Sequence, residues 1–382
     1  MYYNQEFANA RFDIARNLAG RIQNFADNGT LGVPTIHWSN AVTTGATALI
    51  TKPYSFTYQS DHKTTHTHVF EVDIQKQLGS NLSFEIGYVG TLSRNLYGMR
   101  DRNWAIPPGY IGNGAITSIA SRTPYPNYGS IQDIYDFGFG NYNSFAFKVT
   151  KRYSNGVSVI GSYTYSKSLD DSSSIRNAGS QLFPQNDLCI PCEYAPSDFD
   201  VRHRVVASVN YSLPIGAGKL WAPTKALDLI LGEWEFNTIA TFQTGRPYNV
   251  GLSTNNSDTD LSPYDRPNRV VGVPLSPAHR TISEWFNTAA FAVPTFGYLG
   301  NTARGMLTGP GIENFDMALH KSFNMPYNEH HQLQIRFETF NTLNHVNPGV
   351  PSTAIQTPST YGRITSQQGN PRELQLAAKY VF

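Results

Sequence analysis

Segments in which apolar and polar residues alternate, each about 10 to 12 residues long, recur along most of the chain. In the first of them, residues 68–78, Phe70, Val72 and Ile74 alternate with polar neighbours. A period of two is typical of a β-strand with two different faces, because successive side chains point to opposite sides. About nine such segments are clear: 68–78, 81–92, 142–153, 157–168, 203–213, 233–244, 314–323, 331–341 and 373–382. The chain is therefore predicted to be all-β, with antiparallel strands where short turns join the segments.

The length of the segments and of their connections indicates which kind of β protein this is. Strands of soluble sheets usually hold five or six residues, whereas a strand that crosses a membrane needs about 9–11. Most connections alternate between short and long: 79–80, 93–141, 154–156, 169–202, 214–232, 245–313, 324–330 and 342–372. Outer-membrane barrels have short periplasmic turns and long extracellular loops. We therefore predict an antiparallel transmembrane β-barrel of the outer-membrane type, with a secreted, soluble β-rich binding or adhesion protein as the alternative.

Composition argues against other classes. Lys and Arg number 29 and Asp and Glu 28, giving a net charge of +1, without the basic excess of a non-specific nucleic-acid binder. No stretch approaches 18 consecutive apolar residues, so no transmembrane helix is expected. Charged residues make up 15% and aromatic residues 13% of the chain, which favours an aromatic-rich β protein over a helical enzyme.

Cys189 and Cys192 form a CxxC motif inside a long connection. A redox pair of the thioredoxin kind needs a βαβ context, and a zinc site needs a second pair of ligands. A small loop disulfide is therefore the favoured interpretation, ahead of free thiols and of redox or metal chemistry.

No catalytic residue, metal ligand or cofactor site is predicted, and we expect no enzyme. His62, His66 and His68 lie close together but lack a completing ligand. Asp170–Asp171 with Ser172–Ser174 lack the spacing of a calcium loop and are expected at a solvated loop tip. The glycine-rich stretch 300–311 lacks the ending of a phosphate-binding loop.

The chain ends on a strand with an aromatic last residue. Leu374, Leu376, Ala378, Tyr380 and Phe382 share one face of this segment. Tyr380 and Phe382 are predicted to lie in the aromatic girdle at the periplasmic interface.

Eight stretches, in the order in which the family has them, resemble the carboxy-terminal barrel of Oar-like TonB-dependent receptors, outer-membrane proteins with an amino-terminal carboxypeptidase-regulatory-like domain. They include NYNSFAFKVTKRYSNGVSVIGSYTYSKSLDD, SDFDVRHRVVASVNYSLPIGAGK and LQIRFETFNTLNHVNPGVP. The eight stretches are 84–96, 141–171, 197–219, 231–250, 285–291, 300–323, 333–351 and 361–382.

The resemblance implies an outer-membrane barrel of about 22 strands, of which this chain supplies about nine to eleven. Energised family members import bulky nutrients with a plug domain and the TonB complex, and the barrel-assembly machinery reads their last strand, here Leu374, Leu376, Tyr380 and Phe382.

Residues 68–382 are expected to be barrel strands with long extracellular loops, and residues 1–67 a poorly patterned extracellular loop. Neither a plug nor a signal peptide is recognised, so we expect a fragment of a longer receptor. The ligand-binding residues stay unassigned.

Overall fold

The computed structural model describes residues 55–58, 61, 63–111, 116–173, 183–221, 224–259, 265–325 and 328–382. The prediction for residues 1–67 therefore falls mostly outside the described residues.

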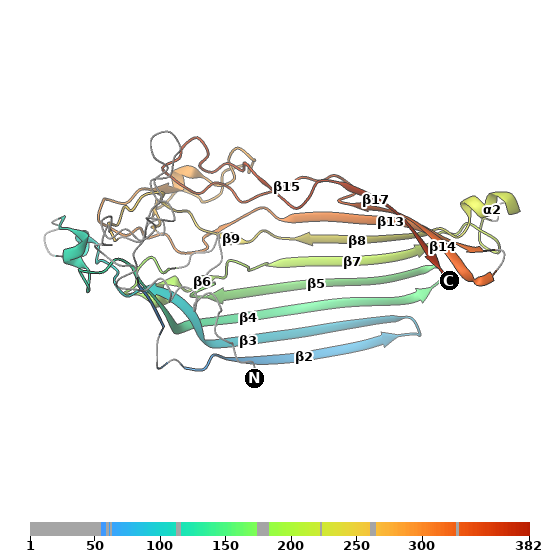
Figure 1. Cartoon of the computed structure of the whole chain (residues 1–382), viewed down its shortest axis with the longest axis horizontal. Helices are drawn as coiled ribbons and strands as arrows, with labels where there is room; N and C mark the ends of the chain where they lie inside the picture. Colours follow the sequence, from blue (N-terminus) through green and yellow to red (C-terminus); the bar gives the residue numbers. More distant parts are fainter. Residues whose placement is uncertain are drawn as a thin grey trace, which may run out of the picture.

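Nine long strands form one continuous antiparallel sheet, in the order β17-β14-β13-β8-β7-β5-β4-β3-β2 (Figure 1). Two short strands complete this eleven-stranded sheet: β1 (Ser55–Tyr58) runs parallel to β4, and β6 (Ala195–Pro196) pairs with the end of β5. Each long strand coincides with one of the alternating segments, which confirms the prediction of an all-β antiparallel fold. The long strands are β2 (His66–Leu78), β3 (Leu82–Asp101), β4 (Ile131–Ser154), β5 (Val157–Asp170), β7 (His203–Ser212), β8 (Glu235–Gln243), β13 (Ile312–Met325), β14 (Asn328–Phe340) and β17 (Glu373–Val381).

The strands have the length of membrane-spanning strands. β17 holds 9 residues and β2 holds 13. At a rise of about 3.3 Å per residue and a tilt of about 40°, they reach heights of about 23–33 Å, close to an apolar band of about 25 Å. The long connections lie together at one end of the sheet, and the short turns lie with the helix α2 (Lys225–Leu231) at the other (Figure 1).

The two faces of the sheet differ in chemistry. Directly opposite residues on neighbouring strands share a face. On one face apolar side chains follow each other from strand to strand, as in Ile86–Phe147–Tyr163–Val205–Phe242 and Leu319–Phe337–Leu376. On the other face lie mainly polar side chains such as Glu85, Lys148, Ser162, Gln334 and Glu338. We call these the apolar face and the polar face.

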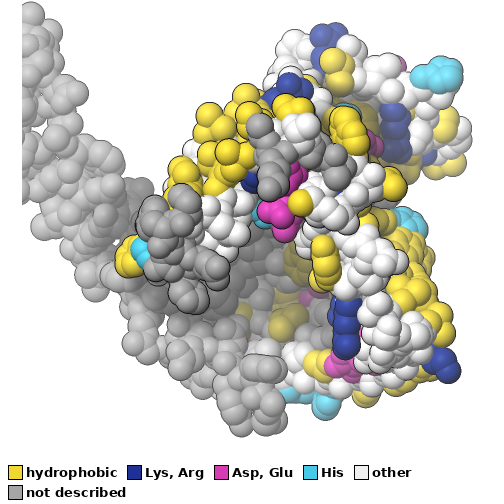
Figure 2. Space-filling view, turned by 90° about the vertical axis from the view of Figure 1, so that its right-hand side faces the viewer, with side chains coloured by type: hydrophobic (Ala, Val, Ile, Leu, Met, Phe, Trp, Pro, Cys, Tyr) yellow, Lys and Arg dark blue, Asp and Glu magenta, His cyan; other side chains and the backbone are white. Residues whose placement is uncertain are grey.

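The apolar face is exposed in this chain. Ile86, Phe145 and Phe337 keep 42%, 46% and 41% of their surface accessible, and hydrophobic side chains gather along the rim of the molecule in the end-on view of Figure 2. In the described residues no second sheet of comparable size packs against this face. In a β-sandwich, the inner faces of two sheets would cover each other. Here one sheet has an exposed apolar face, so the arrangement is that of a barrel wall. The barrel is not closed, since β2 and β17 are the two ends of the sheet in the described residues.

Two strands are longer than the alternation predicts. The connection expected at 93–141 is shorter, because β3 continues to Asp101 and β4 begins at Ile131. The pairing register of β3 shifts twice between Ser93 and Gly98, which interrupts the period of two. At the start of β4, Asp133 and Ile134 are both buried although they are adjacent, so both faces are covered here and no alternation results.

The connections at the long-loop end fold together, and we call their described residues, with the extended ends of β3 and β4, the loop assembly. It holds a hydrophobic core away from the apolar face, made of Tyr248, Val250, Phe286, Ala290, Phe291, Leu307 and Tyr361. Three small sheets pair β9 (Pro247–Tyr248) with β12 (Leu307–Thr308), β10 (Asn268–Arg269) with β11 (Phe291–Ala292), and β15 (Asn347–Pro348) with β16 (Gln367–Gln368). Short 3-10 helices are η2 (Pro108–Tyr110), η4 (Ile119–Arg122), η5 (Ile190–Glu193) and η6 (Thr288–Ala290).

None of the helices in the described residues is both long enough and apolar enough to cross a membrane.

The two faces predict opposite responses to a charge at the same depth. Ala207 lies on the apolar face, opposite Gly161 and Ala240, and its neighbour Ser208 lies on the polar face. We expect Ala207→Arg to lower the free energy of unfolding in phospholipid vesicles by about 2–4 kcal/mol, because arginine near the bilayer midplane is costly. Ser208→Arg is the matched control and should cost less than about 1 kcal/mol. Urea unfolding followed by heat-modifiable gel mobility measures both, and equal losses would contradict the assignment of the faces.

Candidate functional site

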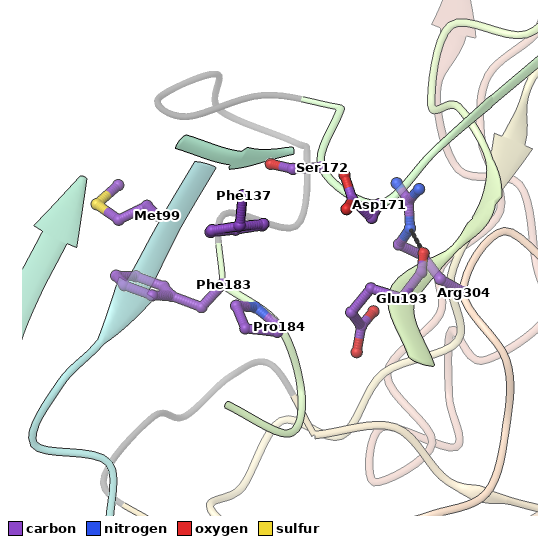
Figure 3. Close-up of a pocket in the computed structure, with 8 residues that line it drawn as sticks. All are labelled: Met99, Phe137, Asp171, Ser172, Phe183, Pro184, Glu193 and Arg304. Atoms are coloured by element: carbon purple, nitrogen blue, oxygen red, sulfur yellow. Dashed lines mark hydrogen bonds between the residues drawn. The ribbon is translucent and has the colours of Figure 1, made fainter. Parts of the chain in front are cut away.

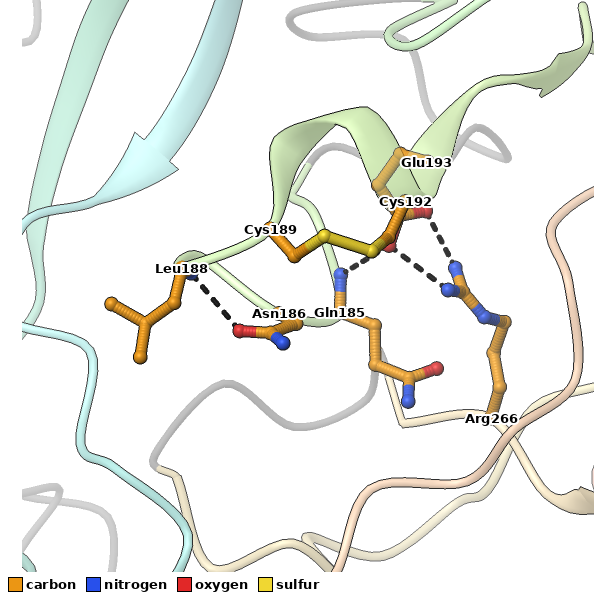
Figure 4. Close-up of a disulfide and its surroundings, with 7 residues drawn as sticks. All are labelled: Gln185, Asn186, Leu188, Cys189, Cys192, Glu193 and Arg266. Carbon is orange, nitrogen blue, oxygen red and sulfur yellow. Dashed lines mark hydrogen bonds and ion pairs between the residues drawn. A yellow bond between two sulfur atoms is a disulfide. The ribbon is translucent and has the colours of Figure 1, made fainter. Parts of the chain in front are cut away.

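Charged side chains gather inside the loop assembly, where buried ion pairs join segments distant in sequence. Glu193 is 1% exposed, and its carboxylate accepts hydrogen bonds from Arg266 Nη1 at 2.7 Å and Nη2 at 2.9 Å (Figure 4). The backbone N–H of Gln185 also donates to this carboxylate, at 3.0 Å. Two parallel bonds from a guanidinium are a strong and directional contact. They tie the β5–β7 connection to the β8–β13 connection.

Arg304 makes a second buried junction between the same two connections. Its guanidinium is bound by the carboxylate of Asp170 at the end of β5, donates to Ser173 Oγ at 2.9 Å, and lies 3.7 Å from Asp198 Oδ1. Its Nε donates to the carbonyl oxygen of Glu193 at 2.9 Å. Removing one partner of such a buried pair leaves an uncompensated charge, so this contact holds the assembly on the end of β5.

The expectation of a solvated tip at Asp170–Asp171 is wrong. Both side chains are buried, at 4% and 5% exposure. Arg304, which comes from the glycine-rich stretch 300–311, supplies the charge that makes burial of Asp170 possible. The sequence signals were an acidic pair at a strand end and a lone arginine in a loop, but nothing in them indicated that the two meet.

Cys189 and Cys192 are joined by a disulfide in the structure, with Cα atoms 5.4 Å apart, within the usual range. The bridge closes a loop of four residues around η5, and the N–H of Cys192 donates to the carbonyl of Cys189 at 3.0 Å. Glu193 follows immediately (Figure 4). The bridge therefore restrains the backbone from which the Glu193 carboxylate reaches Arg266.

A pocket opens beside these ion pairs, between Met99, Phe137, Phe183, Asp171 and Arg304 (Figure 3). Its volume is about 10 Å³, on the order of a single water molecule. Burial raises the pKa of Asp171 to about 6. The pocket is part of the structural junction and is too small for an organic ligand.

A larger cleft lies on the polar face, near the loop end of β8, β13 and β14. Its volume is about 460 Å³, which suits a small organic molecule or part of a larger one. Amide and carboxylate side chains line it: Gln243, Asn314, Asp316, Asn341, Asn370 and Glu373. These groups can donate and accept hydrogen bonds but supply no positive charge. Sequence reasoning missed the cleft, because its residues come from four strands, β8, β13, β14 and β17, and from the connection before β17.

The three histidines that were considered as metal ligands do not form a site in the described residues. His66 and His68 have ring centroids 5.3 Å apart at the start of β2, and His62 lies outside the described residues. In the described part of the chain no group of three His, Cys, Asp or Glu residues is placed to hold a metal ion.

The terminal strand runs from the loop end, where Leu374 lies opposite Thr339, to the turn end, where Tyr380 lies opposite Leu333. Leu374, Leu376 and Tyr380 belong to the apolar face of β17, with Phe382 directly after it. The Tyr380 hydroxyl lies 2.6 Å from Nδ1 of His331 on β14.

Asp187 is one of the buried carboxyl groups that make the stability of the loop assembly depend on pH. Burial raises the pKa of Asp187 to about 7, and its Oδ1 has no hydrogen-bond partner among the described residues. Between about pH 4 and pH 7 the folded chain therefore holds a proton that the unfolded chain has lost, so stability falls as the pH rises through this window. We expect Asp187→Asn to remove about 2–4 kcal/mol of this pH dependence. Urea unfolding of the detergent-solubilised protein at pH 4.5 and pH 8 measures it.

Glu284→Gln, which changes an exposed carboxylate of the same assembly, serves as the control. An Asp187→Asn variant with the wild-type pH profile would show that this carboxyl group is not the source.

Comparison with known proteins places the fold. No curated protein matches the sequence. The outer membrane transporter YddB from Escherichia coli superposes with a TM-score of 0.50 at 11% identity, over 86% of this chain and 34% of that chain. The FrpB iron transporter from Neisseria meningitidis gives a TM-score of 0.38 at 10% identity, over 86% of this chain and 32% of that chain. BauA, the ferric preacinetobactin receptor from Acinetobacter baumannii, gives 0.40 at 9% identity, over 84% and 30%.

At these identities the YddB superposition shows the shared fold alone, and the chain spans about a third of the length of these structures. A family model described as outer membrane beta barrel domain matches residues 1–375. The chain therefore belongs to the outer membrane beta barrel domain family and is a protein of the outer membrane.

Proposed function

We propose that the chain forms the carboxy-terminal part of the barrel of an Oar-like TonB-dependent receptor that takes up a bulky nutrient. The observation that carries this proposal is the sheet. It has nine long strands, one apolar and one polar face, and two edges, β2 and β17, with no strand beyond them in the described residues.

The two edges argue for a larger barrel. A strand edge in lipid leaves backbone groups unpaired at several kcal/mol each, so the sheet needs further strands on both sides. Outer-membrane transporters close their barrels with about 22 strands, of which nine would be a little under half. The remaining length of such a receptor would hold the other strands, a plug domain and the segment that contacts the TonB complex.

The polar face is proposed as part of the ligand path. With the apolar face toward lipid, the polar face lines the lumen of the barrel. The loop assembly then lies outside the cell and the short turns lie in the periplasm. The cleft near Asp316 and Glu373 carries amides and carboxylates, which favours a nutrient rich in hydroxyl or amine groups.

Depletion of nutrients from the medium tests the uptake function. The complete reading frame is deleted in the native host, and compounds left in the spent medium are compared by mass spectrometry with those left by the parent strain. We expect at least one bulky, polar compound to be consumed by the parent and spared by the deletion strain. Removing the inner-membrane TonB complex should spare the same compound.

A strain that carries Asp316→Ala and Glu373→Ala in the complete protein should consume this compound several-fold more slowly, with unchanged amounts of protein in the outer-membrane fraction. Unchanged consumption in the deletion strain would contradict uptake. Recovery of the folded protein in the soluble fraction would favour the secreted binding protein instead.

The last strand is proposed as the segment that the barrel-assembly machinery reads. Its edge offers unpaired N–H and C=O groups to a partner strand, and Phe382 after it is 88% exposed. We expect deletion of Phe382 from the complete protein to lower the assembled fraction several-fold, as measured by heat-modifiable gel mobility. Phe337→Ala removes an equal ring from the apolar face of β14 and should lower it far less. Equal assembly of the two variants would contradict a special role for the terminal residue.

A further inference from the structure

A short helix stands at the end of the sheet that carries the short turns. α2, Lys225–Leu231, belongs to the β7–β8 connection and projects beyond the strand ends (Figure 1). This connection runs from residue 213 to residue 234, whereas residues 155–156 alone join β4 to β5. A turn needs only a few residues, so most of this connection, including α2, is not needed to reverse the chain.

Lys321 determines on which side of the sheet the helix is attached. On β13 this residue lies two positions from both Leu319 and Phe323 and shares their face, so its side chain leaves the sheet on the apolar side. Its Nζ donates to the carbonyl oxygen of Asp228 at 3.1 Å and to that of Gly232 at 2.6 Å. Lys321 is 4% exposed, so the helix covers its ammonium group.

Trp234 makes a second attachment from the same face. It precedes Phe236 of the apolar face by two residues, and its backbone carbonyl continues the β7–β8 ladder by accepting from Leu213. Its indole Nε1 donates to the carbonyl oxygen of Ile230 at 2.8 Å. The last carbonyls of a helix lack partners inside it, and a positive charge is favourable there. Both residues thus hold the carboxyl end of α2 on the apolar side.

The helix and the residues before it expose large apolar side chains. The exposed fractions are 91% for Leu220, 65% for Trp221, 65% for Leu229 and 63% for Ile230. Leu227 and Leu231 are exposed as well. Large exposed apolar side chains concentrated in one segment mark an interaction surface, and this segment is attached to the apolar side of the sheet at its short-turn end.

We propose that α2, together with Leu220 and Trp221, is an interfacial anchor that lies in the phospholipid headgroup and acyl boundary beside the barrel. The inference rests on the proposed insertion of the sheet with its apolar face toward lipid. Lipid is the partner of this helix because the helix is attached to the apolar face, which lipid covers in the proposed insertion. A helix with apolar residues toward the acyl chains and tryptophans at the interface has the chemistry of such an anchor.

Lys321 fits the same arrangement. Its Nζ lies 5.0 Å from the centroid of the Phe323 ring, and two carbonyl oxygens accept from it. An ammonium group at the edge of a lipid-facing surface is costly unless it is paired or reaches water. Here the end of the helix provides the partners, so the lysine and the helix depend on each other.

Fluorescence quenching by lipids tests the proposal. Single cysteines are placed at Leu229, Lys219 and Ile335 in the complete protein with Cys189→Ser and Cys192→Ser, and are labelled with a small fluorophore. Lys219 lines a pocket on the polar face near the same end, and Ile335 lies on the apolar face of β14. The proteins are reconstituted in phosphatidylcholine vesicles with nitroxide lipids labelled close to the headgroup.

We expect probes at Leu229 and Ile335 to be quenched at least threefold more than the probe at Lys219. Quenching at Ile335 without quenching at Leu229 would overturn the anchor while leaving the barrel intact. Absence of quenching at both would contradict insertion itself and thus the proposed function as well. Protection of Leu229 by a second copy or by a periplasmic protein would appear as low quenching that depends on protein concentration or on added extract, and it too would overturn the lipid assignment.

Variants of Lys321 test the attachment. Lys321→Met removes the donors to the Asp228 and Gly232 carbonyls, and we expect quenching at Leu229 to fall at least twofold while quenching at Ile335 stays the same. Lys321→Arg retains donors and should restore most of the quenching. Unchanged quenching in Lys321→Met would show that the lysine does not hold the helix.

Discussion

The need to satisfy every backbone N–H and C=O group without water governs this chain. Within lipid only a continuous ladder of hydrogen bonds can do so, and the nine long strands provide one from β2 to β17. The ladder fixes the register, and the register fixes which side chains share a face. The apolar face, the polar face and the two edges that call for further strands all follow from this ladder.

In a barrel wall lipid covers one face and the lumen lies on the other, so the sheet needs no hydrophobic core of its own. The buried hydrophobic side chains lie in the loop assembly instead. Phe286, Ala290 and Leu307 form a hydrophobic core inside the loop assembly. Near it, Arg266 and Arg304 carry buried charges that Glu193 and Asp170 compensate. Losing one partner of a buried pair is costly because it leaves an uncompensated charge, and here the pairs join two long connections to each other and to the end of β5.

Sequence reasoning predicted the strands that alternate with a period of two, and it missed the features that such a period does not mark. The lipid-facing and lumen-facing parts of the strands alternate, so their positions were predictable. Register shifts near Asn95 and the burial of both faces around Asp133 erase the alternation, so the extensions of β3 and β4 could not be predicted. Glu193 and Arg266 are 73 residues apart, and pairing at such a distance has no local signature. α2 has seven residues, too few to establish a helical period.

The two ends of the sheet are built differently. At the loop end, ion pairs and a small apolar core hold irregular chain together, as suits a surface that faces water. At the turn end, Trp234, Tyr380 and Phe382 lie with α2 near the end of the apolar face, where aromatic rings favour the boundary between lipid and water. A barrel wall can slide in a bilayer until its polar ends meet water on both sides. We therefore expect the aromatic rings and the proposed anchor helix at the turn end to define that boundary more sharply than the loops do, and so to set the depth at which the strands lie.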